Sequence, residues 1–109
     1  MTLLLLTATV QAADAPPAFN QCKACHKVEA GKNAVGPSLF GIFGAKAGSV
    51  AGYQYSTPMK NSGLTWDDAT LSKYLTSPKD LVPGSKMAFA GIKNPDDLKA
   101  VVAYLKTLR

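Results

Sequence analysis

The feature that most constrains the fold of this chain is a long central stretch without periodicity. From Ala30 to Gly63 the sequence is rich in Gly, Pro, Ser and Asn, and its apolar residues recur with neither strand nor helix spacing. The stretch is therefore predicted to form ordered loops. Loops of this length are uncommon inside a compact domain unless they pack against something. The domain therefore needs an apolar surface, from the chain itself or from a bound group, against which these loops can pack.

Length and composition set outer limits on the class of protein. The chain has 109 residues, enough for one domain with a modest core. Hydrophobic residues make up 47% and charged residues 17%, which excludes a charged disordered chain. Two cysteines exclude a disulfide-dense scaffold. A multidomain enzyme, a coiled coil and a polytopic membrane protein are excluded as well.

The first ten residues, MTLLLLTATV, are uncharged and apolar, and small residues follow. This pattern predicts a secretory signal peptide over residues 1–12, truncated at its start because a basic region is missing, and one domain over residues 13–109. A disordered or weakly helical N-terminus is the alternative. Ten apolar residues are too few to span a bilayer, which needs about 20. We therefore expect no stable membrane insertion, although a longer uncleaved anchor remains a further alternative.

Three helices are predicted, one before the aperiodic stretch and two after it. The first spans about Pro16–His26, with Asp14 as its cap. The second spans about Thr65–Ser77 and opens on a capping box. The third starts at the cap Asn94, and its apolar residues recur at helical spacing as far as Leu108. Three helices alone bury little surface, so the core needs a further component.

The segment Cys22-Lys23-Ala24-Cys25-His26 is a C-x-x-C-H motif, the signature of covalent c-type haem attachment. On a helix these three side chains point toward one side. Two thiols at this separation can form thioethers with the two vinyl groups of a porphyrin, and the imidazole can then reach the iron. A haem would also be the large apolar body that the loops need.

Other uses of the motif are weaker. A structural zinc site needs four ligands, and the two cysteines and the single histidine of the chain are all in the motif. A thioredoxin-type redox pair follows a strand in a βαβ pattern, and no strand is predicted before Cys22. A chance C-x-x-C-H with a surface histidine remains an alternative.

The second axial position of the iron has two candidates within the chain. His26 is the only histidine, so bis-histidine ligation within one chain is excluded, and Met59 and Met87 are the thioethers left once Met1 is removed. A buried methionine is more often core filler than ligand. Met87, however, lies in the turn-bounded loop Val82–Gly91. Histidine and methionine ligation raises the reduction potential and favours electron transfer.

At this point the sequence resembles the class I c-type cytochromes, which include mitochondrial cytochrome c and its bacterial relatives. The resemblance covers about Phe19 to Leu108. It rests on five motifs in the family's order, which are CKACH, GPSLFGIFG at Gly36–Gly44, GYQYS at Gly52–Ser56, LTW at Leu64–Trp66 and PGSKMAFAG at Pro83–Gly91. The resemblance implies an all-α fold with three core helices and long loops wrapped around one covalently bound haem c with its iron.

The resemblance also implies roles for individual residues. Met87 matches the distal iron ligand opposite His26, and Pro37 matches the residue whose carbonyl accepts the histidine ring N–H. Tyr74 matches a tyrosine whose hydroxyl approaches the methionine sulfur. Three further residues match hydrogen-bonding partners of the haem propionates, namely Tyr55, Trp66 and Ser85. Phe19 and Tyr104 fall where the first and last helices cross. For each aromatic residue, core packing is the plain alternative.

The chain departs from the family pattern in three places. Ala45 stands where many relatives have an arginine near the propionates, and Lys46 is a candidate replacement. Met59 stands where relatives often have an asparagine, and it adds a rival thioether. A glycine common in the first helix is absent, so the first helix is expected to be short.

The basic residues suggest how such a chain would meet its partners. Lysines flank both the attachment motif and the methionine loop, and they are Lys23, Lys27, Lys32, Lys79, Lys86 and Lys93. They would steer the haem edge onto acidic faces of a bc1-type complex, a terminal oxidase or a reaction centre, although a generally solvated basic surface is the alternative. Nucleic-acid binding is not expected, because the chain has no arginine cluster and no recognised binding module.

The resemblance implies a soluble, monomeric one-electron carrier that is not an enzyme. The expected location is the periplasm, with the mitochondrial intermembrane space as the alternative. The alternative function is a haem peroxidase or a sensor of small ligands that acts when a labile methionine–iron bond opens.

Overall fold

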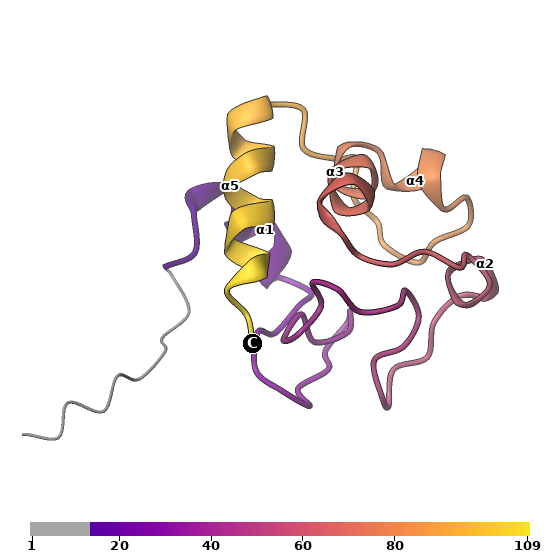
Figure 1. The fold of residues 1–109 in the computed structure, drawn as a ribbon. Helices are drawn as coiled ribbons and strands as arrows, with labels where there is room; N and C mark the ends of the chain where they lie inside the picture. The colour runs from indigo at the N-terminus through magenta and orange to yellow at the C-terminus, as the bar shows by residue number, and fades with distance from the viewer. Residues whose placement is uncertain (1–13) are drawn as a thin grey trace, which may run out of the picture.

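The computed structural model describes residues 14–109, and within this range the chain is helical with long connecting loops (Figure 1). The elements in chain order are the 3-10 helix η1 (Pro17–Phe19), then α1 (Asn20–Lys23), α2 (Thr57–Lys60), α3 (Asp68–Thr76), α4 (Pro78–Leu81) and α5 (Pro95–Lys106). The only β-type pairing among these residues is a single antiparallel bridge between Lys46 and Thr65. The predicted all-α class is therefore confirmed.

The N-terminal helix is shorter than predicted. It starts as the 3-10 turn η1, and α1 ends at Lys23 rather than near His26. Asp14 does not cap it; the cap residue is Pro16, which makes no side-chain cap hydrogen bond. The His26 N–H still donates to the Cys22 carbonyl at 2.9 Å, so one helical turn spans the motif. The predicted signal peptide, residues 1–12, lies outside the described residues.

The helix α3 ends at Thr76, as predicted from Pro78, but its cap differs. Asp67 rather than Thr65 is the cap, and its carboxylate accepts the Thr70 N–H at 2.8 Å. The cap of α5 is the predicted one, because the Asn94 side chain accepts the N–H groups of Asp96 and Asp97. The two short helices α2 and α4 were not predicted, and α2 lies inside the stretch expected to be all loop.

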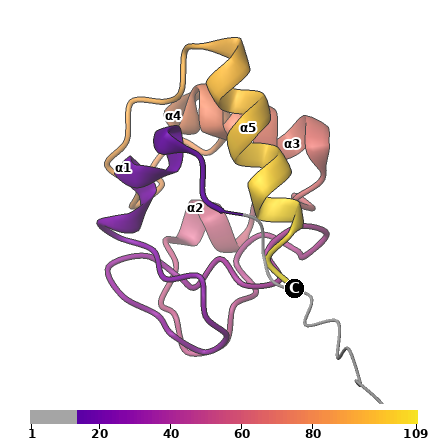
Figure 2. The ribbon, with the colours of Figure 1, turned by 90° about the vertical axis from the view of Figure 1, so that its left-hand side faces the viewer.

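The core joins the two ends of the chain. The rings of Phe19 and Tyr104 meet edge to face with centroids 4.7 Å apart, so η1 packs on α5 as the resemblance implied. The helix α3 packs on both α4 and α5. A salt bridge of 2.7 Å between Lys106 and Asp68 joins α5 to α3 at the surface. Figures 1 and 2 show α5 and α3 on one side of the molecule and the loops of residues 24–56 below them.

No helix among residues 14–109 has the length and apolar character needed to cross a membrane.

Candidate functional site

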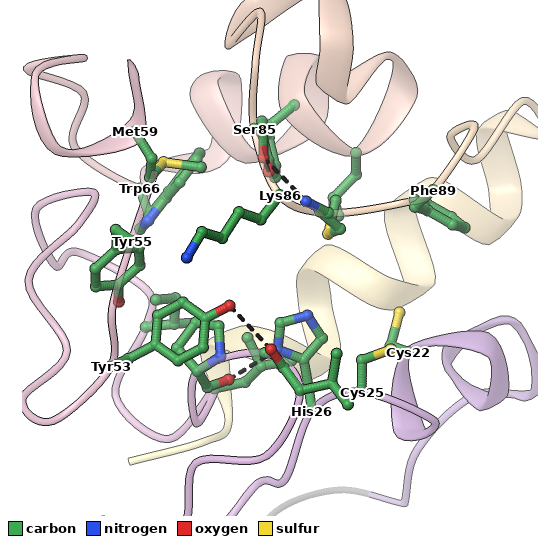
Figure 3. A pocket seen from close by; sticks show the side chains of 18 of the residues that line it. Cys22, Cys25, His26, Tyr53, Tyr55, Met59, Trp66, Ser85, Lys86 and Phe89 are labelled. Atoms are coloured by element: carbon green, nitrogen blue, oxygen red, sulfur yellow. Dashed lines mark hydrogen bonds between the residues drawn. The ribbon is translucent and has the colours of Figure 1, made fainter. Parts of the chain in front are cut away.

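One cavity of about 550 Å³ opens between the helices and the loops (Figure 3). Its size falls in the usual range for cofactor sites. It is lined by all nine predicted site residues, namely Cys22, Cys25, His26, Pro37, Tyr55, Trp66, Tyr74, Ser85 and Met87. Eight of these residues lie in the five sequence motifs and Tyr74 lies on α3, so the fold assembles the site from separate segments of the chain.

The imidazole of His26 is held on two sides. Its Nδ1 lies 2.8 Å from the Pro37 carbonyl oxygen, and because a carbonyl can only accept, Nδ1 carries the ring proton. This leaves Nε2 with a free lone pair, so Nε2 is the atom that a metal would bind. The ring also lies against the backbone of Gly36, where an added Cβ would be only 2.4 Å from its Cε1. The ring therefore has a fixed tautomer and a fixed plane.

The two cysteines are half-buried and unpaired by any disulfide. Burial, with a smaller contribution from Cys25, raises the pKa of the Cys22 thiol above its ordinary value of 9.0. This thiol is therefore protonated at neutral pH. Within residues 14–109 no three His, Cys, Asp or Glu side chains group as a metal site. These observations fit thioether formation better than zinc ligation.

The hydroxyl of Tyr55 faces both the cavity and the backbone. It accepts the Val50 N–H at 3.1 Å and keeps its own proton to donate. Burial raises the pKa of Tyr55 above its ordinary value, partly offset by the Val50 hydrogen bond. The phenol therefore stays protonated and can donate to an acidic group in the cavity, as a propionate partner must.

Trp66 and Tyr74 form the wall beside it. Trp66 is buried, and its ring centroid lies 5.0 Å from that of Tyr74. Figure 3 shows the indole nitrogen on the cavity side, and among the described residues no buried side-chain nitrogen or oxygen lacks a hydrogen-bond partner. Core packing and a donor role are thus compatible for this tryptophan.

Tyr74 reaches the methionine loop through Ser85. The Tyr74 hydroxyl and Ser85 Oγ lie 2.8 Å apart, and Ser85 Oγ also accepts the Met87 N–H at 3.4 Å. Burial raises the pKa of Tyr74, so its hydroxyl remains a neutral partner. The serine that the resemblance assigns to a propionate is therefore also part of the support for Met87.

The other methionine has a different environment. Met59 is 8% exposed and lies on α2, whose cap Ser56 accepts the Met59 N–H. Figure 3 shows its thioether beside Trp66, at the far end of the cavity from Cys22. Because the cysteines fix one edge of a bound porphyrin, a side chain at the opposite end would meet its periphery. Lys46 is exposed and does not line the cavity, so it is not placed to replace the missing arginine.

Sequence reasoning missed several residues of the cavity. Tyr53, Gln54 and Gly36 line it, although only the neighbouring Tyr55 and Pro37 were singled out. The Lys86 side chain, predicted only as a docking charge, donates to the Gln54 carbonyl at 3.0 Å across the opening. The signal for Tyr53 and Gln54 was available, because both lie within the GYQYS motif.

An apolar cavity with two thiols, a preset imidazole, a methionine loop and phenol and indole donors fits a haem. Its apolar walls, which include Leu71, Leu75 and Leu105, are those that a flat porphyrin requires.

Comparison with known proteins gives a consistent result. The family model described as Cytochrome c matches residues 12–109. The chain is 66% identical over 96 residues to cytochrome c2 iso-2 of Magnetospirillum fulvum, covering 88% of this chain and 100% of that protein. It is 60% identical over 97 residues to cytochrome c2 of Rhodoplanes tepidamans, covering 88% and 99%. The structure is similar to that of cytochrome cH from Methylobacterium extorquens, with a TM-score of 0.79 and 54% identity over 83% of this chain and 91% of the other.

Proposed function

Because this chain belongs to the cytochrome c family, we propose that it is a soluble carrier of single electrons between larger redox complexes. The observation that carries this proposal is the cavity that brings His26 and Met87 together with both cysteines of the attachment motif. The cofactor is haem c, covalently attached, whose iron takes up and releases one electron when bound.

In this proposal each chain residue has a holding or tuning task. Cys22 and Cys25 would hold the porphyrin through thioethers. Nε2 of His26 and the sulfur of Met87 would bind the iron, which would leave no position open to small ligands. Tyr55 and Trp66 donate to the propionates. The apolar walls exclude water, which keeps the environment of the iron nearly the same in both oxidation states.

The choice between a carrier and a ligand-binding protein is tested with carbon monoxide. We expect the reduced native protein to bind carbon monoxide negligibly at neutral pH, because Met87 occupies the sixth position. The variant Met87→Ala should bind it readily. Met59→Ala is the matched control, since it removes the other buried thioether, and it should behave as the native protein does.

Ready binding of carbon monoxide by the native protein would contradict the carrier function and favour the peroxidase or sensor. Binding by Met59→Ala but not by Met87→Ala would instead show that Met59, and not Met87, is the iron ligand. A haem stain on the denatured, reduced chain tests the covalent attachment separately, since colour lost on denaturation would exclude thioethers.

We further propose that the six lysines that flank the attachment motif and the methionine loop form a docking face for acidic partners such as a bc1-type complex, a terminal oxidase or a reaction centre. All six are exposed in the structure, and Lys86 lies at the cavity opening.

The proposed location is the periplasm, after removal of residues 1–12. N-terminal sequencing of the mature protein would test this removal.

The docking face is tested by charge reversal. Lys27→Glu should lower the rate constant of association with an acidic redox partner severalfold at low ionic strength, because it places a like charge against the partner. Lys99→Glu on α5 changes the net charge equally but lies outside the proposed face, so its effect should be smaller. The difference between the rate constants of the two variants should shrink as the salt concentration rises above about 0.1 M, because salt screens the charges. Equal effects of both variants in stopped-flow measurements would show that the lysines act only through the net charge of the protein and form no docking face.

A further inference from the structure

Tyr53 has no role in the function proposed above, yet it ties two loops together beside the cavity. Its hydroxyl donates to the Val35 carbonyl at 2.9 Å. Two residues earlier, the Ala51 carbonyl accepts from Asn33 Nδ2 at 3.0 Å. The segment of residues 51–53 is thus bonded twice to the segment of residues 33–35. Figure 3 shows the Tyr53 hydroxyl reaching toward the His26 side of the cavity.

The Val35 backbone depends on this hydrogen bond because its side chain is not packed. Val35 is 74% exposed, the largest exposure among the large hydrophobic residues described. Tyr53, by contrast, is anchored. Its ring packs edge to face on Tyr55 with centroids 4.8 Å apart, and Tyr55 is itself bonded to the Val50 N–H. The position of Tyr53 is therefore set by its packing on Tyr55, and its hydrogen bond in turn fixes the position of the Val35 backbone.

The next two residues after Val35 are those that hold the imidazole. The Gly36 backbone leaves no room for a Cβ against the His26 ring, and the Pro37 carbonyl accepts its Nδ1–H. The Gly36 N–H donates to the Cys25 carbonyl at 2.7 Å, and the Gly36 carbonyl accepts the Ala34 N–H at 2.9 Å, so the Gly36 backbone joins the attachment motif to the loop that Tyr53 contacts. A displacement of Val35 would consequently pass directly into both contacts of the ring.

We propose that Tyr53 is a positioning residue for His26, acting through the Val35 carbonyl and the Gly36–Pro37 backbone. The hydroxyl holds this backbone against the imidazole, and so sets the strength of the Pro37 hydrogen bond and the orientation of the ring. This inference rests on His26 being the iron ligand proposed above.

The test compares Tyr53→Phe with Tyr104→Phe in the haem-loaded protein. Each variant removes one phenol hydroxyl, but only the Tyr53 hydroxyl is bonded to the backbone beside His26. Hydrogen exchange of the His26 Nδ1–H and of the Gly36 N–H is followed by NMR in the reduced state, with amides in the middle of α5 as reporters of global opening. In Tyr53→Phe we expect both protons to exchange roughly tenfold faster while the α5 amides keep their rates. In Tyr104→Phe the two protons should keep their native rates.

Unchanged exchange in Tyr53→Phe would overturn the proposal. Equal acceleration in both variants, or acceleration that includes α5, would also overturn it by showing a general loss of stability. The oxidised unmodified protein separates this result from a failure of the proposed ligation. His26 ring protons without a paramagnetic shift would mean that His26 is not a ligand, whereas failure of the positioning role alone leaves that shift in place.

Discussion

The imidazole of His26 is constrained at the level of single atoms. A carbonyl fixes its proton on Nδ1, and a glycine backbone lies against its ring. Together these contacts leave the ring one tautomer and one plane before any metal binds. A ligand held in this way does not need to reorganise when the iron changes charge, which is the property an electron carrier requires.

The clearest residue-scale prediction concerns Gly36→Ala. The added Cβ would lie 2.4 Å from Cε1 and 2.7 Å from Nδ1 of His26, so either the ring or the backbone must move. Overpacking of this kind costs about 1–3 kcal/mol. We expect a lower denaturant midpoint and altered paramagnetic shifts of the His26 ring.

The control for this prediction is Gly31→Ala. A Cβ at Gly31 meets nothing within 4 Å, although its φ of +73° is strained for alanine at a cost of about 1–2 kcal/mol. This variant should lose stability without changing the His26 shifts. Identical His26 shifts in native protein and Gly36→Ala would show that the glycine does not position the ring.

Individual site residues were predictable where a motif or the resemblance names them. The attachment motif and the methionine loop contain five of the nine predicted residues that line the cavity, and the His26–Pro37 pair followed from resemblance. The link from Tyr74 through Ser85 to the Met87 N–H did not, because it depends on the spacing of two side chains from separate elements. Tyr53 was missed since its partner is a backbone carbonyl, for which no residue type gives a signal.

At the scale of elements, the helices are short and depend on their caps. The helix α3 has nine residues, too few to be stable alone, so its start is set by the Asp67 carboxylate. The hydrogen bond from the Thr70 N–H holds the pKa of Asp67 below its ordinary value of 3.8. The ionised carboxylate therefore stabilises the fold above this value, and the contribution is lost as the pH falls through the lower folded-state pKa.

Asp67→Ala should lower the unfolding temperature at neutral pH because the cap is lost. The gap between the native protein and this variant should narrow as the pH falls below 3.8 and through the lower folded-state pKa of Asp67, because the native carboxylate then becomes protonated as well. Thr65→Ala is the control, since Thr65 is the cap expected from sequence but not in the structure. It should change stability by less than about 0.5 kcal/mol at any pH. A larger loss in Thr65→Ala would reverse the assignment of the cap.

The elements also show the limit of pattern reading. The amphipathic repeat of α5 and its Asn94–Pro95 start were sufficient to place it, because twelve residues carry several turns of signal. The helices α2 and α4 have four residues each and contain one turn, so periodicity cannot reveal them. At α3 two candidate caps lie two residues apart, and only the backbone geometry decides between them.

At the scale of the whole molecule, the core is arranged around the cavity. Nine of the fourteen buried hydrophobic residues described also line it, among them Phe19, Leu71, Val101 and Leu105. The helices therefore meet one another over only part of their apolar surface. This explains how a chain with a long aperiodic stretch can form one domain, since its loops enclose the cofactor instead of packing on a sheet or bundle.

The last prediction follows from this arrangement. A chain that cannot attach haem, such as Cys22→Ala with Cys25→Ala prepared without the cofactor, should be largely unfolded, because the walls of the cavity would lose the surface they bury. Its circular dichroism should show little helix, and it should lack a cooperative thermal transition. Added haem should restore part of the helix, since a ligand that binds only the folded state stabilises it in proportion to its concentration. The single variant Cys22→Ala, loaded through Cys25, is the control and should keep its helices. Native helix content and cooperative melting of the haem-free chain would contradict the prediction, and would mean that contacts such as Phe19 with Tyr104 hold the fold without the cofactor.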